Sequence, residues 1–509
     1  MMFDCLNGFH ILDSCALEEL YSQPSSTLSK FLESIKKDSF DNNDRIIFYN
    51  FTKIDTNLLD HLYQTLIYVD IPEFFVLVIS NQQDTMQYLN NKLNVILVDH
   101  PLSKATSKIV PIFNTSQSLC AHAWAGIHLR PNGTAAPCCD SLEVITKPNG
   151  IPYNIKLDTI DEFLNSKWMQ DLRQSFRSGE RSKNCVSCWQ REDRGQDSRR
   201  TLTPYKLENI YGNINWEDGG QLMYLGGHLG TLCNLKCRIC SSEYSSSIAN
   251  EYLAEITFVN KKNSIHYQTL TDSKWVFEDQ FWELVKNNAN RIKNYEFLGG
   301  EPFMLNQNSE FLKFLVDNNL SIDTIFYFST NGTQYPEILD YVDYFKRLEL
   351  TISIDNIGKR FELERCNAEW ATVEGNLTRM IIQREKFKNL KIDLCITVNI
   401  QNVLYLSEIL SWVRSVNIDS YYFNYVNTPK YLAITNLTDN GKELVINTLT
   451  TGKFTTIEQF DIDATIDIIK NSQGSDGVEF VQQMQRFDRL RNQDFSKTHS
   501  DIAKAMGYQ

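Results

Sequence analysis

The sequence predicts an α/β protein whose largest part is a parallel sheet of six strands, arranged as a partial (β/α)6 TIM-like barrel. Two observations lead to this expectation. Between residues 221 and 430, strand-like and helix-like runs alternate, and some of the strands carry small and polar residues that could line a cavity. An open doubly wound sheet is the alternative. In either fold, the chemistry belongs at the carboxyl ends of the strands.

The six strand-like runs are apolar or alternating, and each is short enough for a strand. They span residues 221–229, 293–300, 324–330, 347–355, 391–399 and 420–426. Helix-like stretches lie between most of them, at 278–288, 308–318, 336–345, 370–384 and 403–415. Because a helix between two strands lets the second strand run in the same direction as the first, this order predicts a parallel sheet.

Three further regions flank this one. Residues 1–110 hold three apolar runs (45–51, 74–80 and 94–99) and helix-like stretches at 25–37 and 57–68, which predicts a small α/β domain for recognition or partner binding. Residues 111–220 are rich in Cys, Gly and Pro, with one amphipathic segment from residue 160 that has helix-end signals at Asn165 and Gly179. Residues 431–509 form a mainly helical C-terminal extension.

Composition excludes several classes of protein. The chain has 509 residues, with 50 basic and 63 acidic side chains and a net charge of −13, which argues against nucleic-acid binding. No apolar run reaches the ~18 residues that a membrane span needs, and the first residues lack the features of a signal peptide. We therefore expect a cytoplasmic protein. In the reducing cytosol, clustered cysteines indicate a metal site or a catalytic site more than disulfides. Eight of the 12 cysteines lie between residues 120 and 240.

Three of these cysteines, Cys233, Cys237 and Cys240, form a CxxxCxxC loop directly after the first strand. Ser241 or Ser242 can cap the helix that follows, so the loop lies at the functional end of the sheet. Zinc is one interpretation, although structural zinc sites usually close four positions with paired CxxC units. Three thiolates suit a cubane iron–sulfur cluster with one iron that has no protein ligand. Such an iron can bind a small molecule.

Polar motifs follow the next three strands: GGEP after the second, TNGT after the third and SIDN after the fourth. The residues concerned are Gly299, Gly300, Glu301, Pro302, Asn331, Ser353 and Asp355. Together with the cysteine loop, these motifs resemble the radical S-adenosylmethionine (AdoMet) superfamily. The resemblance implies a [4Fe-4S] cluster that binds AdoMet and cleaves it reductively, and a 5′-deoxyadenosyl radical that takes hydrogen from a substrate.

The resemblance also implies roles for single residues. The bare backbone of GGEP approaches the methionine amino group and Glu301 accepts its charge. Asn331 meets a ribose hydroxyl, Ser353 and Asp355 contact AdoMet, and Arg365 pairs with its carboxylate. Ile239 stands where the superfamily often has an aromatic residue against adenine, so an aliphatic side chain would pack there instead.

A second set of cysteines lies upstream. The spacing of Cys120, Gly133 and Cys138 resembles the opening of the SPASM and twitch auxiliary-cluster modules. Asn132 and Gly133 suit a hairpin turn that returns Cys138 to Cys120. The resemblance implies one further iron–sulfur cluster, of the [4Fe-4S] type. Its expected ligands are Cys120, Cys138, Cys185 and Cys188, with Cys139 as a substitute. A zinc knuckle is the alternative, and the module here precedes the barrel, whereas it follows the barrel in most members.

The resulting expectation is an enzyme that oxidises or cross-links a peptide or protein side chain, with the auxiliary cluster accepting an electron. A flavodoxin or ferredoxin is the electron donor that the resemblance implies. The alternatives are a dehydrogenase or epimerase acting on a sugar or nucleotide, a nucleic-acid modifier, and a metal-stabilised scaffold without catalysis. Intact GGEP and cysteine motifs argue against the scaffold, and the acidic charge argues against nucleic acid.

Overall fold

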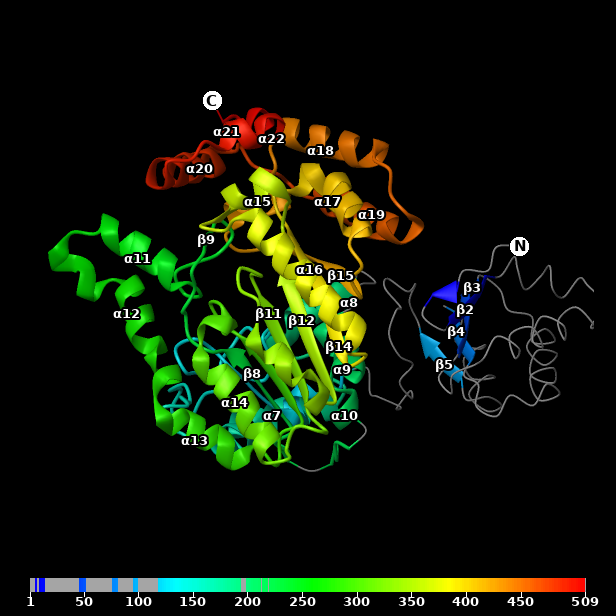
Figure 1. Cartoon of the computed structure of the whole chain (residues 1–509), viewed down its shortest axis with the longest axis vertical. Helices are drawn as coiled ribbons and strands as arrows, with labels where there is room; N and C mark the ends of the chain where they lie inside the picture. Colours follow the sequence, from blue (N-terminus) through cyan, green and yellow to red (C-terminus); the bar gives the residue numbers. More distant parts are fainter. Residues whose placement is uncertain are drawn as a thin grey trace, which may run out of the picture. The chain divides into compact units, whose positions relative to one another are not determined.

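A computed structural model describes residues 118–193, 198–211, 213–217 and 219–508, together with five strands that lie between residues 5 and 98 (Figure 1). The chain divides into two compact units. One comprises residues 1–117 and 189–206, and the other comprises residues 118–188 and 207–509. None of the helices in these described segments combines the length and apolarity that crossing a bilayer requires.

The first unit contains a five-stranded sheet. Its strands lie in chain order: β1 (Cys5–Leu6), β2 (Phe9–Asp13), β3 (Arg45–Phe51), β4 (Val76–Ser80) and β5 (Val95–Val98). Strands β2 to β5 are parallel, and β1 is antiparallel to β2. The three predicted strands are confirmed as β3, β4 and β5. The helices expected at 25–37 and 57–68 lie outside the described residues.

The second unit is built on an eight-stranded sheet. Six parallel strands follow the chain order: β8 (Tyr224–His228), β10 (Asn294–Leu298), β11 (Ile325–Thr330), β12 (Arg347–Ser353), β14 (Leu390–Val398) and β15 (Ser420–Tyr425). They are the six strands that the sequence predicted. A doubly wound sheet reverses its strand order at a switch point, and these six strands keep one direction.

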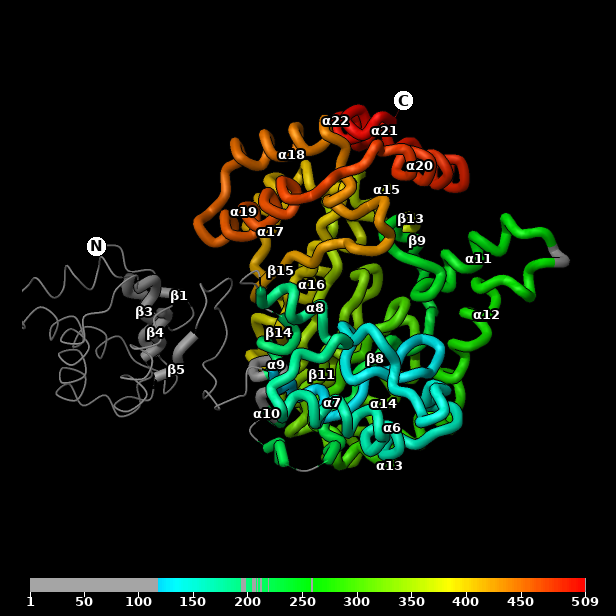
Figure 2. The backbone as a smooth tube through the Cα atoms, turned by 180° about the vertical axis from the view of Figure 1, so that it is seen from behind, coloured from blue at the N-terminus to red at the C-terminus, as the bar shows by residue number. Residues whose placement is uncertain are grey.

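The sheet is extended at its β8 edge by residues from the cysteine-rich segment. Strand β6 (Gly126–Leu129) runs parallel to β8, and β7 (Ala135–Ala136) is antiparallel to β6. Figure 2 shows this segment in cyan. Strand β6 approaches β8 closely, because a Cβ built on Gly126 would meet the carbonyl oxygen of Tyr224 at 1.7 Å. The cysteine-rich segment therefore shares the main sheet of the second unit.

Helices cover the outer face of this sheet. Those between the strands are α11 (Ser246–Glu255), α12 (Ile265–Asp272), α13 (Asp279–Asn288), α14 (Asn306–Asp317), α15 (Gly358–Glu364), α16 (Trp370–Lys386) and α17 (Leu406–Ser415). The segment expected as a helix at 336–345 is a 3₁₀ helix, η5 (Glu337–Tyr344). Tyr295 of β10 packs against Phe311 of α14 with ring centroids 5.2 Å apart, and Phe297 of β10 packs against Trp282 of α13 with ring centroids 6.2 Å apart. Because successive residues of a strand point to opposite faces, the residues that alternate with Tyr295 and Phe297 along β10 point to the inner face of the sheet.

The amphipathic segment from residue 160 forms two helices, α6 (Ile160–Leu164) and α7 (Lys167–Arg177). The first ends at Asn165, as expected. The chain then restarts because the Ser166 hydroxyl accepts a hydrogen bond from the backbone N–H of Met169 and caps α7. Gly179 follows the end of α7 with a φ of +82°, the left-handed conformation that favours glycine.

The remaining helices are short or belong to the C-terminal part. The short ones are α5 (His122–Ala125), α8 (Val186–Glu192), α9 (Arg199–Lys206) and α10 (Glu208–Tyr211). The C-terminal ones are α18 (Asp439–Thr451), α19 (Thr456–Lys470), α20 (Val478–Arg491), α21 (Phe495–Thr498) and α22 (Ser500–Ala505). Figure 1 shows this last group, in orange and red, beside α15 and α17.

Candidate functional site

The three-cysteine loop is fixed by a small two-stranded ladder. Strand β9 (Lys236–Cys237) pairs antiparallel with β13 (Arg365–Cys366), so that Cys237 lies opposite Arg365. Helix α11 begins after the loop, and its cap is Ser245, not Ser241 or Ser242 as expected. Residues 241–245 first form a tight turn, in which the N–H groups of Tyr244 and Ser245 bond to the Ser241 carbonyl, and this turn delays the start of the helix.

The thiols of this loop lie in a shielded environment. Cys233 is buried, and Cys237 and Cys240 are half-buried. Burial raises the pKa of all three thiols, that of Cys240 to about 12, and the neighbouring thiols raise those of Cys237 and Cys240 further. Three ionised thiolates at this place therefore need a neighbouring positive charge to stabilise them. The iron of a bound metal cluster would supply that charge.

Donors also point at the sulfur atoms. The backbone N–H of Leu235 donates to the Cys233 sulfur at 3.5 Å, and the Arg365 guanidinium donates to the Cys237 sulfur at 3.9 Å. Among the residues that the structure describes, no three His, Cys, Asp or Glu side chains converge as ligands of a single metal ion. A cubane takes one thiolate for each iron, and thiols that are neighbours on one loop fit that donor set.

The GGEP motif packs directly against the cysteine loop. A Cβ on Gly300 would lie 2.3 Å from the carbonyl oxygen of Leu232, and the N–H of Glu301 donates to the same oxygen at 2.7 Å. At Gly299, a Cβ would lie 3.2 Å from the carbonyl oxygen of Leu229. The two glycines are therefore needed for backbone packing, and Pro302 begins the 3₁₀ helix η4 (Pro302–Met304) beyond them.

The Glu301 carboxylate is almost fully buried, at 2% exposure. Its Oε1 accepts hydrogen bonds from the Thr330 hydroxyl (2.7 Å) and the Phe303 N–H (3.3 Å), and its Oε2 accepts one from the Asn331 N–H (2.7 Å). Burial outweighs these donors and raises the pKa of Glu301 to about 7. A cationic ligand beside this carboxylate would hold it ionised at neutral pH.

Asn331 connects the TNGT turn to the cysteine loop. Its side-chain amide donates to the Asn234 side-chain oxygen at 2.9 Å, and Asn234 donates in turn to the Thr333 hydroxyl at 2.9 Å. Asn367 donates to the backbone carbonyl of Asn234 at 3.1 Å. Sequence reasoning missed Asn234, although its place inside the CxxxC spacing was a usable signal.

Asp355 and Arg365, both predicted for the site, form a buried ion pair. Asp355 Oδ2 accepts from Arg365 Nε at 2.9 Å and Nη2 at 2.6 Å, and Asp355 Oδ1 accepts from the backbone N–H of Thr397 at 3.0 Å. Burial raises the pKa of Asp355, and the Arg365 charge opposes that rise. Ser353 ends β12 opposite Cys395 of β14. The predicted residues of the four motifs thus meet at one end of the sheet.

The upstream cysteines lie on connected segments. The expected hairpin is present, since Gly133 has a φ of +84° and the Arg130 N–H donates to the Thr134 carbonyl at 2.7 Å. Cys138 and Cys139 follow β7, and the N–H of Leu142 then donates to the Asn184 carbonyl at 3.1 Å. Asn184 precedes Cys185, which ends the 3₁₀ helix η1 (Lys183–Cys185), and Cys188 lies on α8. Cys120 precedes α5, where its carbonyl accepts from the N–H of Ala123 at 3.1 Å.

No family model matches the chain, and no curated protein matches it either. Solved structures do match. Native anSMEcpe with bound AdoMet and Cp18Cys peptide is 15% identical, with a TM-score of 0.28, and the match covers 45% of this chain and 58% of that one. SuiB of Streptococcus suis bound to S-adenosylmethionine is 14% identical, with a TM-score of 0.28 and coverage of 66% and 69%. A second SuiB structure is 13% identical, with a TM-score of 0.29 and coverage of 71% of each chain.

The chain spans about 58–64% of the length of the anSMEcpe structures that it matches. Identities of 13–15% and TM-scores below 0.5 are too low to carry a reaction or a substrate from these proteins to this one. Two of these solved proteins hold bound AdoMet. The resemblance of this chain to the radical AdoMet superfamily rests on its motifs.

Proposed function

We propose that this chain is a radical AdoMet enzyme. The observation that carries the proposal is the convergence of four motifs from distant parts of the chain. The cysteine loop packs on GGEP through Gly300, joins TNGT through Asn234 and Asn331, and pairs with Arg365, which is bound to Asp355 of the SIDN motif. The donor set of three neighbouring thiols fits a cubane with one open iron.

Cys233, Cys237 and Cys240 would hold a [4Fe-4S] cluster, which supplies the electron for reductive cleavage of AdoMet when it is bound. Glu301 accepts the ammonium group of AdoMet, Asn331 binds its ribose, and Ser353 and Asp355 contact the cofactor. Ile239, half-buried on the cysteine loop, packs on the adenine. Each of these groups stands on a loop at the carboxyl end of the sheet, where loops from several strands can contact one ligand.

Arg365 acts on the cluster side of the site in this proposal. Its Nε and Nη2 are already bound to Asp355, and its Nη1 points to the Cys237 sulfur at 3.9 Å. A fixed positive charge beside a ligand sulfur favours the thiolate and offsets the negative charge of the cluster. The expected pairing of Arg365 with the AdoMet carboxylate stays a prediction.

The substrate in this proposal is a peptide or protein side chain, which the enzyme oxidises or cross-links. Cys120, Cys138, Cys185 and Cys188, with Cys139 as a substitute, would hold the auxiliary iron–sulfur cluster that accepts the substrate electron. The hydrogen bond between Leu142 and Asn184, which ties the two halves of this cysteine set together, supports it. The α/β domain before residue 111 adds a surface for recognition, and a flavodoxin or ferredoxin donates electrons.

The test is anaerobic incubation of the reconstituted protein with AdoMet and dithionite, with 5′-deoxyadenosine measured by mass spectrometry and iron and sulfide counted. Cys240→Ala should lose one cubane and the product. The matched control is Cys366→Ala, since Cys366 is a buried thiol in the same ladder that lies outside the ligand set. A fully loaded wild type that yields no 5′-deoxyadenosine, or a Cys240→Ala protein that keeps both clusters, overturns the proposal.

A further inference from the structure

Arg238 lies inside the cysteine loop, between the proposed ligands Cys237 and Cys240, and its side chain has 0% exposure. A guanidinium in such a position is costly to bury unless its charge is paired and its N–H groups are bonded. An arginine on a loop ordinarily extends its charged group into solvent. The residues that surround Arg238 therefore indicate which contacts fix the position of the loop.

The partners of Arg238 come mostly from the C-terminal helices. Its Nη2 donates to Asp488 Oδ1 at 2.5 Å and to Gln493 Oε1 at 2.9 Å, and its Nη1 lies 3.3 Å from the Met484 sulfur. The rings of Phe487 and Phe495 lie 5.6 and 5.7 Å from the guanidinium carbon, within the range of cation–π contacts. These residues stand about 250 positions after the loop.

Asp488 is held in place from its other side. Its Oδ2 accepts hydrogen bonds from the Phe495 N–H at 2.7 Å and from the Tyr508 hydroxyl at 2.5 Å. The carboxylate is therefore oriented by the C-terminal segment itself, and it presents its remaining oxygen to Arg238. Such preorganisation makes the ion pair directional and fixes where the Arg238 backbone can lie.

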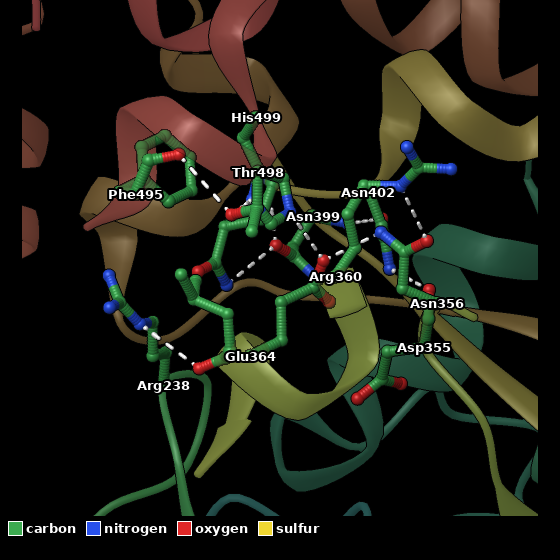
Figure 3. A network of polar contacts seen from close by, with 12 residues as sticks. Arg238, Asp355, Asn356, Arg360, Glu364, Asn399, Asn402, Phe495, Thr498 and His499 are labelled. Atoms are coloured by element: carbon green, nitrogen blue, oxygen red, sulfur yellow. Dashed lines mark hydrogen bonds and ion pairs between the residues drawn. The ribbon is translucent and has the colours of Figure 1, made fainter. Parts of the chain in front are cut away.

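The residue before the opposite strand of the ladder is tied to the same C-terminal segment. His499 Nε2 lies 2.9 Å from Glu364 Oε1, which also accepts from the Asn356 side chain at 2.7 Å, and the Glu364 carbonyl accepts from the Arg238 N–H at 2.8 Å. Figure 3 shows His499, Glu364 and Arg238 along this line, with Asp355 close by. The residues that flank the two strands, Arg238 after β9 and Glu364 before β13, thus have direct connections to the segment that contains α20–α22.

A third connection reaches the helix after the loop. Arg491 of α20 donates to both carboxylate oxygens of Glu251 on α11, at 3.2 and 2.9 Å, and Glu251 also pairs with Lys236 of β9 at 2.9 Å. The Arg491 and Glu251 side chains are 1% and 8% exposed. The C-terminal segment therefore contacts the cysteine loop, the residue before its partner strand and the helix after the loop.

We propose that helices α20–α22 form a clamp that sets the geometry of the cysteine loop, with Arg238 and Asp488 as positioning residues for the iron–sulfur cluster. This inference rests on the proposed function as far as the cluster is concerned. The clamp itself consists of contacts within the chain, which do not depend on a bound metal. Both residues act through the backbone on each side of Arg238.

The test measures the loop in the full chain with and without iron. Hydrogen exchange of the metal-free protein reports on peptides covering 232–245, and transfer of iron from the reconstituted protein to a chelator reports on cluster retention. Asp488→Asn removes the negative charge that pairs with Arg238. It should raise both rates about tenfold or more, because one charge-assisted hydrogen bond is lost. The matched control is Asp463→Asn, since Asp463 is an exposed residue of α19 that accepts a hydrogen bond from Gln459 outside the clamp and should leave both rates unchanged.

A milder variant guards against simple misfolding. Tyr508→Phe removes one hydrogen bond to Asp488 from a half-buried residue near the end of the chain and should raise loop exchange about threefold. Unchanged exchange at 232–245 in both variants overturns the clamp, and faster exchange with unchanged iron transfer overturns its role for the cluster. If the wild type binds no cluster, the proposed function fails, and the exchange result alone still decides whether Asp488 orders the loop.

Discussion

Gly300→Ala tests the packing of GGEP on the cysteine loop most directly. The added Cβ would meet the carbonyl oxygen of Leu232 at 2.3 Å and that of Thr231 at 2.6 Å, so the backbone must move by about 1 Å to reach an ordinary contact. Overpacking a tight site costs about 1–3 kcal/mol, and because the atoms met here are backbone, we expect the upper end, about 3 kcal/mol. The N–H of Glu301, bonded to Leu232, moves with it.

Gly375→Ala is the matched control, because Gly375 is an exposed residue within α16 and its Cβ would meet nothing within 4 Å. Alanine in place of glycine in a helix interior adds about 0.8–1 kcal/mol of stability. The two variants remove similar freedom from the unfolded chain, so their difference of about 3 kcal/mol reports the clash itself. Urea unfolding of the metal-free protein measures it, with a midpoint about 1 M lower for Gly300→Ala if the m-value is about 3 kcal/mol/M. If the Gly300→Ala protein unfolds at the same urea concentration as the Gly375→Ala protein, the reasoning is refuted.

Three further outcomes are expected. Asp355→Ala leaves Arg365 buried without its partner, so it should lower the free energy of unfolding by about 3–5 kcal/mol in the same urea assay, and a change below about 1 kcal/mol contradicts the ion pair. AdoMet affinity should fall up to about tenfold for each pH unit below 7, because Glu301 then carries a proton that must leave before the carboxylate can meet an ammonium group; calorimetric titration across pH 5.5–8 measures this, and a flat profile argues against Glu301 as the acceptor. Cys185→Ser should reduce the iron content from about eight atoms to about four without abolishing reductive AdoMet cleavage, and an unchanged iron count rules it out as a ligand.

Much of the second unit followed from local patterns. Apolar runs separated by amphipathic stretches predicted β8 to β15 in their order, because a strand buried on both faces leaves a strong signal in the sequence. The motifs were also placed correctly at strand ends, since GGEP, TNGT and SIDN each follow a run of that kind. Parallel topology then brings such ends together without any further information.

The connections across the chain were not predictable in this way. No local pattern shows that β6, from the cysteine-rich segment, pairs with β8, because the choice of a sheet edge depends on tertiary contacts. The pairing of Arg238 with Asp488 joins residues 250 positions apart, and neither position is unusual in its neighbourhood. The cap at Ser245 was missed because several serines compete there and the turn before the helix decides among them.

The clamp has a consequence for how the protein is made. Asp488 is synthesised 250 residues after Arg238, so at about 5–20 residues per second the ribosome needs roughly 12–50 s to supply it. During that interval the cysteine loop has left the ribosome without the partner that orders it. Under the proposed clamp, iron–sulfur delivery becomes effective only once Asp488 has been made, and a host that oxidises nascent thiols within a minute would yield a metal-poor product.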